Sequence, residues 1–231
     1  MTVWTLSPAE WTIVLLSLKV AVCCVIVLVL PAMMVAWILA RRRFWGQSLL
    51  DAVVHLPMVL PPVVLGYMLL VLLGRKGWIG SWLYEQFHIQ LTFHWWGAVI
   101  ASAVMAFPLM VRSIRQALHQ VDPLLEQAAQ TLGASPVKVF FTITLPLSYH
   151  GLLTGAILAF SRSLGEFGAT ITFAGNLEGE TRTLPLAIYS LTQTPEGDGA
   201  ALRLVILSVL VSVLALLGSQ WLERRLIRSR R

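Results

Sequence analysis

The side chains that could perform covalent or metal chemistry are few in this chain and poorly spaced for it. Cys23 and Cys24 are the only cysteines, and they stand next to each other in an apolar run, which excludes a disulfide framework and a zinc site built from cysteines. Gly74-Arg75-Lys76-Gly77 lacks the Gly-x-x-x-x-Gly-Lys-Ser/Thr spacing of a phosphate-binding loop. The histidines show no metal-ligand spacing: His55, His88, His94, His119 and His150. The sequence therefore predicts no catalytic site, no cofactor and no metal in this chain.

The residues that do stand out form a polar segment, 122–136, between two apolar runs. Asp122-Pro123 is typical of a helix N-cap followed by the first helical position, and Gly133 is typical of the residue that ends a helix. Ser135-Pro136 begins a second helix in the same way. A short capped helix over 123–133 is therefore expected between two membrane helices.

One face of this expected helix carries Glu126, Ala129 and Gly133, with Ala128 beside them. Small residues let a partner's backbone approach closely, and a single carboxylate would orient that partner. The residues alone leave two interpretations open. The face is either a docking site for another protein or the solvated face of an ordinary surface helix.

The composition indicates that the surrounding elements lie in a bilayer. The 231 residues are 57% hydrophobic and 12% charged, with a mean hydropathy of +0.77, whereas a soluble domain carries about 25% charged residues. A span needs roughly 20 apolar residues. The pattern predicts a single all-α polytopic membrane domain over residues 1–231, with five spans at about 12–40, 52–74, 95–116, 137–161 and 203–222. The first run is too long for a signal peptide, and three arginines follow it.

The placement of the basic residues predicts the orientation of the chain. Of the 17 Lys and Arg, 11 fall in 41–43, 112–138 and 224–231, and five fall in the opposite loops. Basic residues gather on the cytoplasmic side, so the N-terminus is expected outside and the C-terminus in the cytoplasm. The basic tail suits anionic lipid headgroups better than nucleic acid. Lys19, within the first run, is expected to extend towards the interface.

Two further segments depart from plain apolar helices. The second span contains Pro57, Pro61 and Pro62, which remove backbone donors and break the helical ladder. This span is either a kinked packing helix or a kink that lines a pathway. In the external connection 162–203, the pieces Phe167–Gly175 and Thr183–Thr194 are too short to span and are expected to be buried or to line a cavity.

The motif Glu126-x-Ala128-Ala129-x-x-x-Gly133, followed by Ile143-x-Leu145-Pro146, resembles the EAA loop of ABC importer permeases. The resemblance implies the type I ABC importer permease fold. It also implies that this helix couples to an ATP-hydrolysing subunit, and it assigns that coupling to Glu126, Ala128, Ala129, Gly133, Leu145 and Pro146. ATP and Mg²⁺ would then be bound by the partner and not by this chain.

The resemblance extends from about residue 10 to 222 and is to the molybdate group of these permeases. The segments that show this resemblance are Leu124–Pro146, Leu56–Tyr67, Ser163–Ile171 and Gly179–Pro185. It implies a homodimer in the bacterial inner membrane with two ATP-binding subunits and an external oxyanion-binding protein. Tungstate, sulfate or thiosulfate is the alternative substrate. A stand-alone secondary transporter and an intramembrane enzyme are the rival classes, disfavoured by the absence of inverted repeats and of a catalytic constellation.

The translocation path is predicted along the second span and the external signature, at Pro61, Pro62, Ser163, Glu166, Gly168, Thr170 and Thr172. Arg162 and Glu166 stand at i and i+4 and could simply pair at a helix end. A glutamate is a poor ligand for an oxyanion, so Glu166 is interpreted as structural or gating. A path that conducts needs weak sites rather than a tight one.

Overall fold

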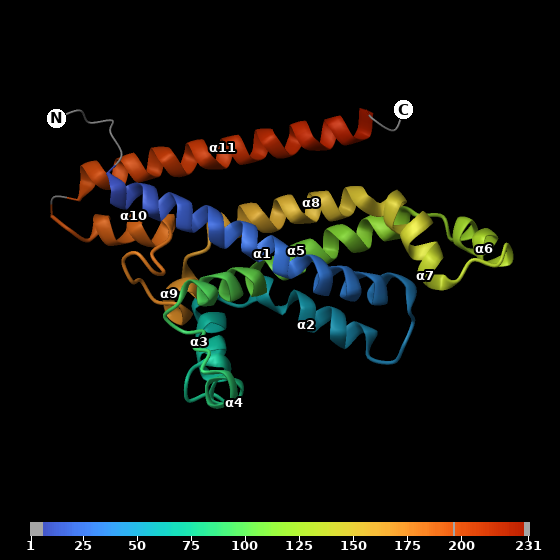
Figure 1. Ribbon diagram of the computed structural model, residues 1–231, viewed down its shortest axis with the longest axis horizontal. Coiled ribbons are helices and arrows are strands. Elements are labelled where there is room, and N and C mark those ends of the chain that lie inside the picture. The colour runs from blue at the N-terminus through green and yellow to red at the C-terminus, as the bar shows by residue number, and fades with distance from the viewer. Residues whose placement is uncertain (1–6, 196, 229–231) are drawn as a thin grey trace.

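The computed structural model describes residues 7–195 and 197–228, and the side chains up to residue 218. Within these residues the chain is helical and has no strand (Figure 1). The long helices are α1 (Pro8–Arg41), α5 (Trp95–Gln120), α8 (Leu145–Leu164) and α11 (Asp198–Arg228). The shorter helices are α2 (Gln47–Val59), α3 (Pro62–Leu73), α4 (Trp78–Phe87), α6 (Pro123–Thr131), α7 (Pro136–Val139), the π-helical turn η1 (Phe140–Thr144), α9 (Gly168–Phe173) and α10 (Leu184–Thr192).

The described chain contains four helices long and apolar enough to cross a membrane, one of them the continuous run Pro136–Leu164. The pair α2 and α3 forms a fifth only if the two bent helices count together as one span. This arrangement is that of a multi-pass membrane protein.

Small residues hold the central helices α1, α5 and α8 close together. A Cβ on Gly151 would lie 2.3 Å from the Cβ of Ala117, and one on Gly155 would lie 3.2 Å from Met110. The hydroxyl of Ser113 on α5 donates to the carbonyl of Gly151 on α8 at 3.0 Å. Lipid tails give helices no hydrophobic reason to associate, so close backbone contact of this kind is what stabilises a membrane bundle.

The predicted second span, 52–74, is two helices rather than one. Between α2 and α3 the chain bends by 115°, because Leu60 is extended and Pro61 and Pro62 supply no amide for the ladder. A Cβ on Gly66 would lie 2.7 Å from the carbonyl oxygen of Ala169, so α3 packs directly on α9. Figure 1 shows α3 and α4 turned away from the long axis of the bundle.

The two short apolar pieces of the external connection are buried in protein, as expected. They form α9 and α10, in which Phe173 and Leu186 are fully buried. The amide of Leu184 donates to Ser17 on α1 at 2.8 Å. Arg203 is bound to Glu10 at 3.1 Å and so ties α11 to the start of α1.

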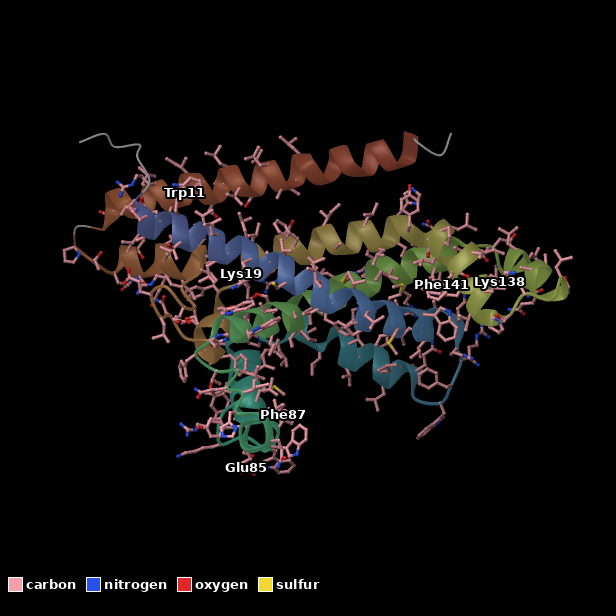
Figure 2. All side chains as sticks on the ribbon, in the orientation of Figure 1. Trp11, Lys19, Glu85, Phe87, Lys138 and Phe141 are labelled. Carbon is pink, nitrogen blue, oxygen red and sulfur yellow. The ribbon has the colours of Figure 1, made fainter. Side chains whose placement is uncertain are left out.

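The polar segment 122–136 lies at one end of the bundle, and α10 and the start of α1 lie at the other (Figure 1). Lys19, labelled in Figure 2, is exposed. Its ammonium group lies 3.6 Å from the centre of the ring of Trp95, the first residue of α5, which is a cation–π contact. Arg230 and Arg231 of the predicted basic tail lie outside the described residues.

Candidate functional site

The helix expected from the polar segment is α6, and its ends are those that the sequence predicts. The carboxylate of Asp122 accepts from the amide of Leu124 at 2.9 Å. Gly133 has a left-handed φ of 86°, and the amide of Ala134 donates to the carbonyl of Ala129 at 3.0 Å. These bonds satisfy groups that a helix end otherwise leaves unpaired. The helical residues end at Thr131, two before the predicted boundary at 133.

Glu126 joins three elements through one carboxylate oxygen. Its Oε1 accepts from Nη2 of Arg41, at the end of α1, at 2.8 Å. The same oxygen accepts from Oγ1 of Thr144, in η1, at 2.7 Å. The side chains of Arg41 and Glu126 are only 16% and 17% exposed. Charge-assisted bonds of this kind are stronger than neutral ones, so α6 is held firmly against the bundle.

Three leucines form an apolar stripe on the exposed side of α6 and its C-cap, beside exposed polar residues such as Gln127. The exposed fractions of Leu124, Leu125 and Leu132 are 67%, 48% and 88%. Ala128 lies on the same side and is also exposed, whereas Ala129 is half-buried beside Glu126. The face expected from the sequence is therefore divided: Glu126 points towards the bundle, and the leucines point out. These leucines were not predicted from the sequence, although their spacing with Ala128 is that of one helical stripe.

Leu145 and Pro146 lie in the first turn of α8, half-buried and directly after η1. Proline has no amide to continue the helical ladder, and such positions favour a π-helical turn. The amide of Leu145 donates to the carbonyl of Phe140, five residues back. These two residues therefore shape the junction beside Thr144 instead of extending the exposed surface of α6.

At the opposite end of the bundle, Glu166 is almost fully buried. Its side chain is 1% exposed and its Oε2 lies 2.6 Å from Nη1 of Arg162. Its Oε1 accepts from the amide of Ala169 at 2.9 Å and so caps α9. The two carboxylate oxygens thus join the end of α8 to the start of α9, which fits the structural interpretation of this glutamate.

Beside this pair is a cavity of about 350 Å³ at the break between α2 and α3. Its lining brings together some of the predicted path residues with Arg162: Pro62, Val63, Arg162, Gly165, Glu166, Phe167 and Gly168. Only glycine fits at position 168 so close to α3, because a Cβ on Gly168 would lie 2.8 Å from the Cβ of Pro62.

The remaining predicted path residues do not line that cavity. Pro61 is exposed immediately before it, while Ser163 and Thr170 are buried, at 6% and 1% exposure. Thr172 donates to the carbonyl of Gly168 at 2.9 Å and packs against α3 at Gly66. In the part of the chain that the structure describes, no group of three or more His, Cys, Asp or Glu side chains could hold a metal ion.

Comparison with known proteins decides the family. Residues 32–228 match the family described as binding-protein-dependent transport system inner membrane component. The chain belongs to this family. The chain is 57% identical to the molybdenum transport system permease protein of Escherichia coli K12 over 219 residues, covering 95% of this chain and 96% of the relative. It is 56% identical to the corresponding Haemophilus influenzae protein, covering 91% of this chain and 92% of the relative. The resemblance to ABC importer permeases is thus confirmed.

Other relatives of the family are more distant. A sulfate transport system permease protein of Synechocystis is 40% identical, covering 78% of this chain and 66% of the relative. Among solved structures, a bacterial ABC transporter that imports alginate has a TM-score of 0.71 at 17% identity, over 95% of this chain and 80% of that one. An inward-facing methionine ABC transporter has a TM-score of 0.68 at 15% identity, covering 96% of each chain. Both confirm the type I importer permease fold.

Proposed function

We propose that this chain is the permease subunit of an ATP-driven ABC importer for molybdate in the bacterial inner membrane. Five spans, with the bent pair α2 and α3 as one, place the N-terminus outside and the C-terminus in the cytoplasm. Relatives named for molybdenum transport at 57% identity support the substrate. The mechanism is supported above all by the orientation of α6: its leucines face outward, while Glu126 binds its inner side to Arg41.

In the proposed complex, two copies of this chain pair and each α6 docks on one ATP-binding subunit. The leucine surface suits this role, because the core of a protein interface is apolar and depleted of charge. ATP and Mg²⁺ are bound by those subunits, and this chain hydrolyses nothing itself. An external binding protein delivers the oxyanion.

Movement of α6 has a defined route into the membrane. Arg41 carries it to α1, and Thr144 carries it through η1 to α8. The far end of α8 is the Arg162–Glu166 pair beside the cavity at Pro62. Helices packed as tightly as α5 and α8 shift as rigid bodies. Closure of the ATP-binding subunits therefore opens that cavity to one side of the membrane and then to the other, which is transport by alternating access.

The cavity of about 350 Å³ beside Pro62, called the outer cavity below, has charges that fit an anion passing through without being held. Arg162 offers a cation, and the carboxylate of Glu166 is paired with it at 2.6 Å. This pairing weakens the attraction for a dianion, and conduction needs weak binding. We assign Glu166 to balancing the charge of Arg162 and to gating. The remaining predicted path residues pack around the same path.

The experiment that tests the proposal is uptake into proteoliposomes holding this chain with its ATP-binding subunit and binding protein. Labelled molybdate should accumulate only with ATP, and excess sulfate should compete poorly. Preferential uptake of sulfate or thiosulfate would mean that the same importer carries that substrate instead of molybdate. Uptake of tungstate is measured in parallel. Uptake by this chain alone, driven by an ion gradient, would instead support a secondary transporter.

A further inference from the structure

A second polar cavity lies between α2 and α5, towards the end of the bundle that carries α6. Its volume is about 420 Å³ and every residue that lines it has a polar side chain: Asp51, His55, Arg112, Arg115, Gln116 and His119. Ionisable side chains on membrane helices are costly and usually mark a path for ions or substrate. None of the roles assigned above uses this cavity.

The cavity is built by two helical faces that meet. On α5, Arg112, Arg115 and His119 stand at i, i+3 and i+7 and so share one face. On α2, Asp51 and His55 stand at i and i+4. Because α2 packs along α5, the two faces turn their polar side chains towards one space.

The charges in this space favour an anion. Oδ1 of Asp51 accepts from Nη1 of Arg115 at 2.7 Å, while the backbone carbonyl of Asp51 lies 2.8 Å from Nδ1 of His55. Arg112 is exposed and, within the described residues, has neither an ion pair nor a hydrogen bond. Two guanidinium groups therefore face one carboxylate. Each guanidinium has five N–H donors, and most of those on Arg115 remain available.

We infer that this cavity binds a tetrahedral oxyanion dianion at the cytoplasmic end of the path, with Arg112 as its main ligand. The inference rests on the proposed function and extends it to a second site. Arg115, held in place by Asp51, is the second ligand, and Gln116 and His119 offer further polar contacts.

The cavity at Asp51 is lined by α2, whereas the cavity at Pro62 begins in α3, beyond the break between the two helices. Each cavity contains an arginine bound to a carboxylate on a neighbouring residue or helix. Two such sites in series are what a path needs to bind an ion and still release it.

The phosphate of a lipid headgroup has the same chemistry as the oxyanion and is the alternative occupant. Basic residues at the inner ends of spans commonly meet headgroups. Arg112 is exposed and is open to either occupant, whereas Asp51 holds Arg115 towards α2. This geometry favours a ligand between the helices.

The test is equilibrium dialysis of labelled molybdate against the complex of this chain with its ATP-binding subunit, in maltoside detergent without nucleotide. Binding to the ATP-binding subunit alone is subtracted. Arg112→Gln should weaken the remaining binding roughly ten- to hundredfold, the value of a charged hydrogen bond. The matched control is Arg43→Gln, which removes an exposed arginine beyond the cavity and should leave binding unchanged.

A second variant should change the affinity for molybdate in the opposite direction. Asp51→Asn removes the competing negative charge but keeps an oxygen that can accept from Arg115. It should tighten molybdate binding several-fold, whereas a purely structural role would weaken binding or leave it unaltered. Equal affinity of the wild-type and Arg112→Gln complexes would overturn the inference. So would native mass spectrometry showing a phospholipid that Arg112→Gln loses and molybdate does not displace.

Uptake separates this inference from the proposed function. ATP-driven accumulation of molybdate by the wild-type complex supports the importer whatever the cavity does. If that uptake occurs and Arg112→Gln binds molybdate normally, the inner site alone is refuted. If the wild-type complex accumulates no molybdate, the proposed function itself fails.

Discussion

The two ends of the bundle each contain a glutamate bound to an arginine, and the two pairs do different work. Glu126 is bound to Arg41 across 85 positions of sequence, and its partners join α1, α6 and η1. Glu166 is bound to Arg162 only four residues away and joins neighbouring helices α8 and α9. The distant pair is suited to transmit movement between elements, whereas the local pair fixes one turn of the chain in place.

Removing the local carboxylate should have the largest effect on folding. Glu166→Ala would leave Arg162 without its partner and the amide of Ala169 without an acceptor. Breaking a buried pair costs about 3–5 kcal/mol, and the 30% exposure of Arg162 reduces this to roughly 2–4 kcal/mol. Thermal unfolding of the purified complex measures the loss.

The matched control for that change is Glu178→Ala. Glu178 is also four residues from an arginine, Arg182, but its side chain is 72% exposed and the two groups are 3.4 Å apart. An exposed pair of this kind contributes about 0–1 kcal/mol. Equal destabilisation by the two variants would contradict the structural role given to Glu166.

Removing the distant carboxylate should act on transport more than on folding. Glu126→Ala frees α6 from α1 and η1, and we expect ATP-driven uptake to fall at least about tenfold, the value of a lost charged hydrogen bond. ATP hydrolysis by the partner should persist. Uptake and hydrolysis are measured in the same proteoliposomes, so that their ratio reports coupling.

A double-mutant cycle separates the pair from its surroundings. Arg41→Ala should reproduce the uptake defect, and Arg41→Ala with Glu126→Ala should be little worse than either alone, because both remove one interaction. Additive losses would mean that Glu126 acts directly on the ATP-binding subunit and not through α1.

The leucine surface of α6 should affect partner binding alone. Leu132 is 88% exposed, so Leu132→Ser should leave unfolding unchanged while weakening binding of the ATP-binding subunit about tenfold, a typical loss for an apolar anchor. Gln127→Ser, also an exposed position on α6, is the control. Co-purification and titration of the partner measure both, and an unaltered affinity of Leu132→Ser would remove the leucines from the interface.

The smallest effect is expected at the C-terminal cap of α6. A Cβ on Gly133 would meet no atom within 4 Å, but its φ of +86° disfavours any other residue. Gly133→Ala should therefore cost about 1 kcal/mol, and Gly133→Asn less, because asparagine tolerates this conformation. Gly133→Trp, which combines strain with bulk, should reduce both partner binding and uptake. Thermal unfolding and uptake together test this order.

Local features were predictable because they depend on a few adjacent residues. Asp122 and Gly133 cap α6 as their types dictate, and α9 and α10 fall within the short apolar segments expected between turns. The break at Pro61 and Pro62 was also expected, since proline removes the amide. Its angle of 115° was not, because a missing amide breaks a helix without setting the direction of the next one.

The sequence by itself determined that this is a membrane protein with a capped polar helix between spans, and its motifs identified the family. Only the tertiary structure decided that Glu126 turns inward to Arg41 and that leucines form the outer surface. Only the structure brought Arg112 and Arg115 opposite Asp51. Helical spacing gives which residues share a face, but the direction of that face depends on neighbours distant in sequence.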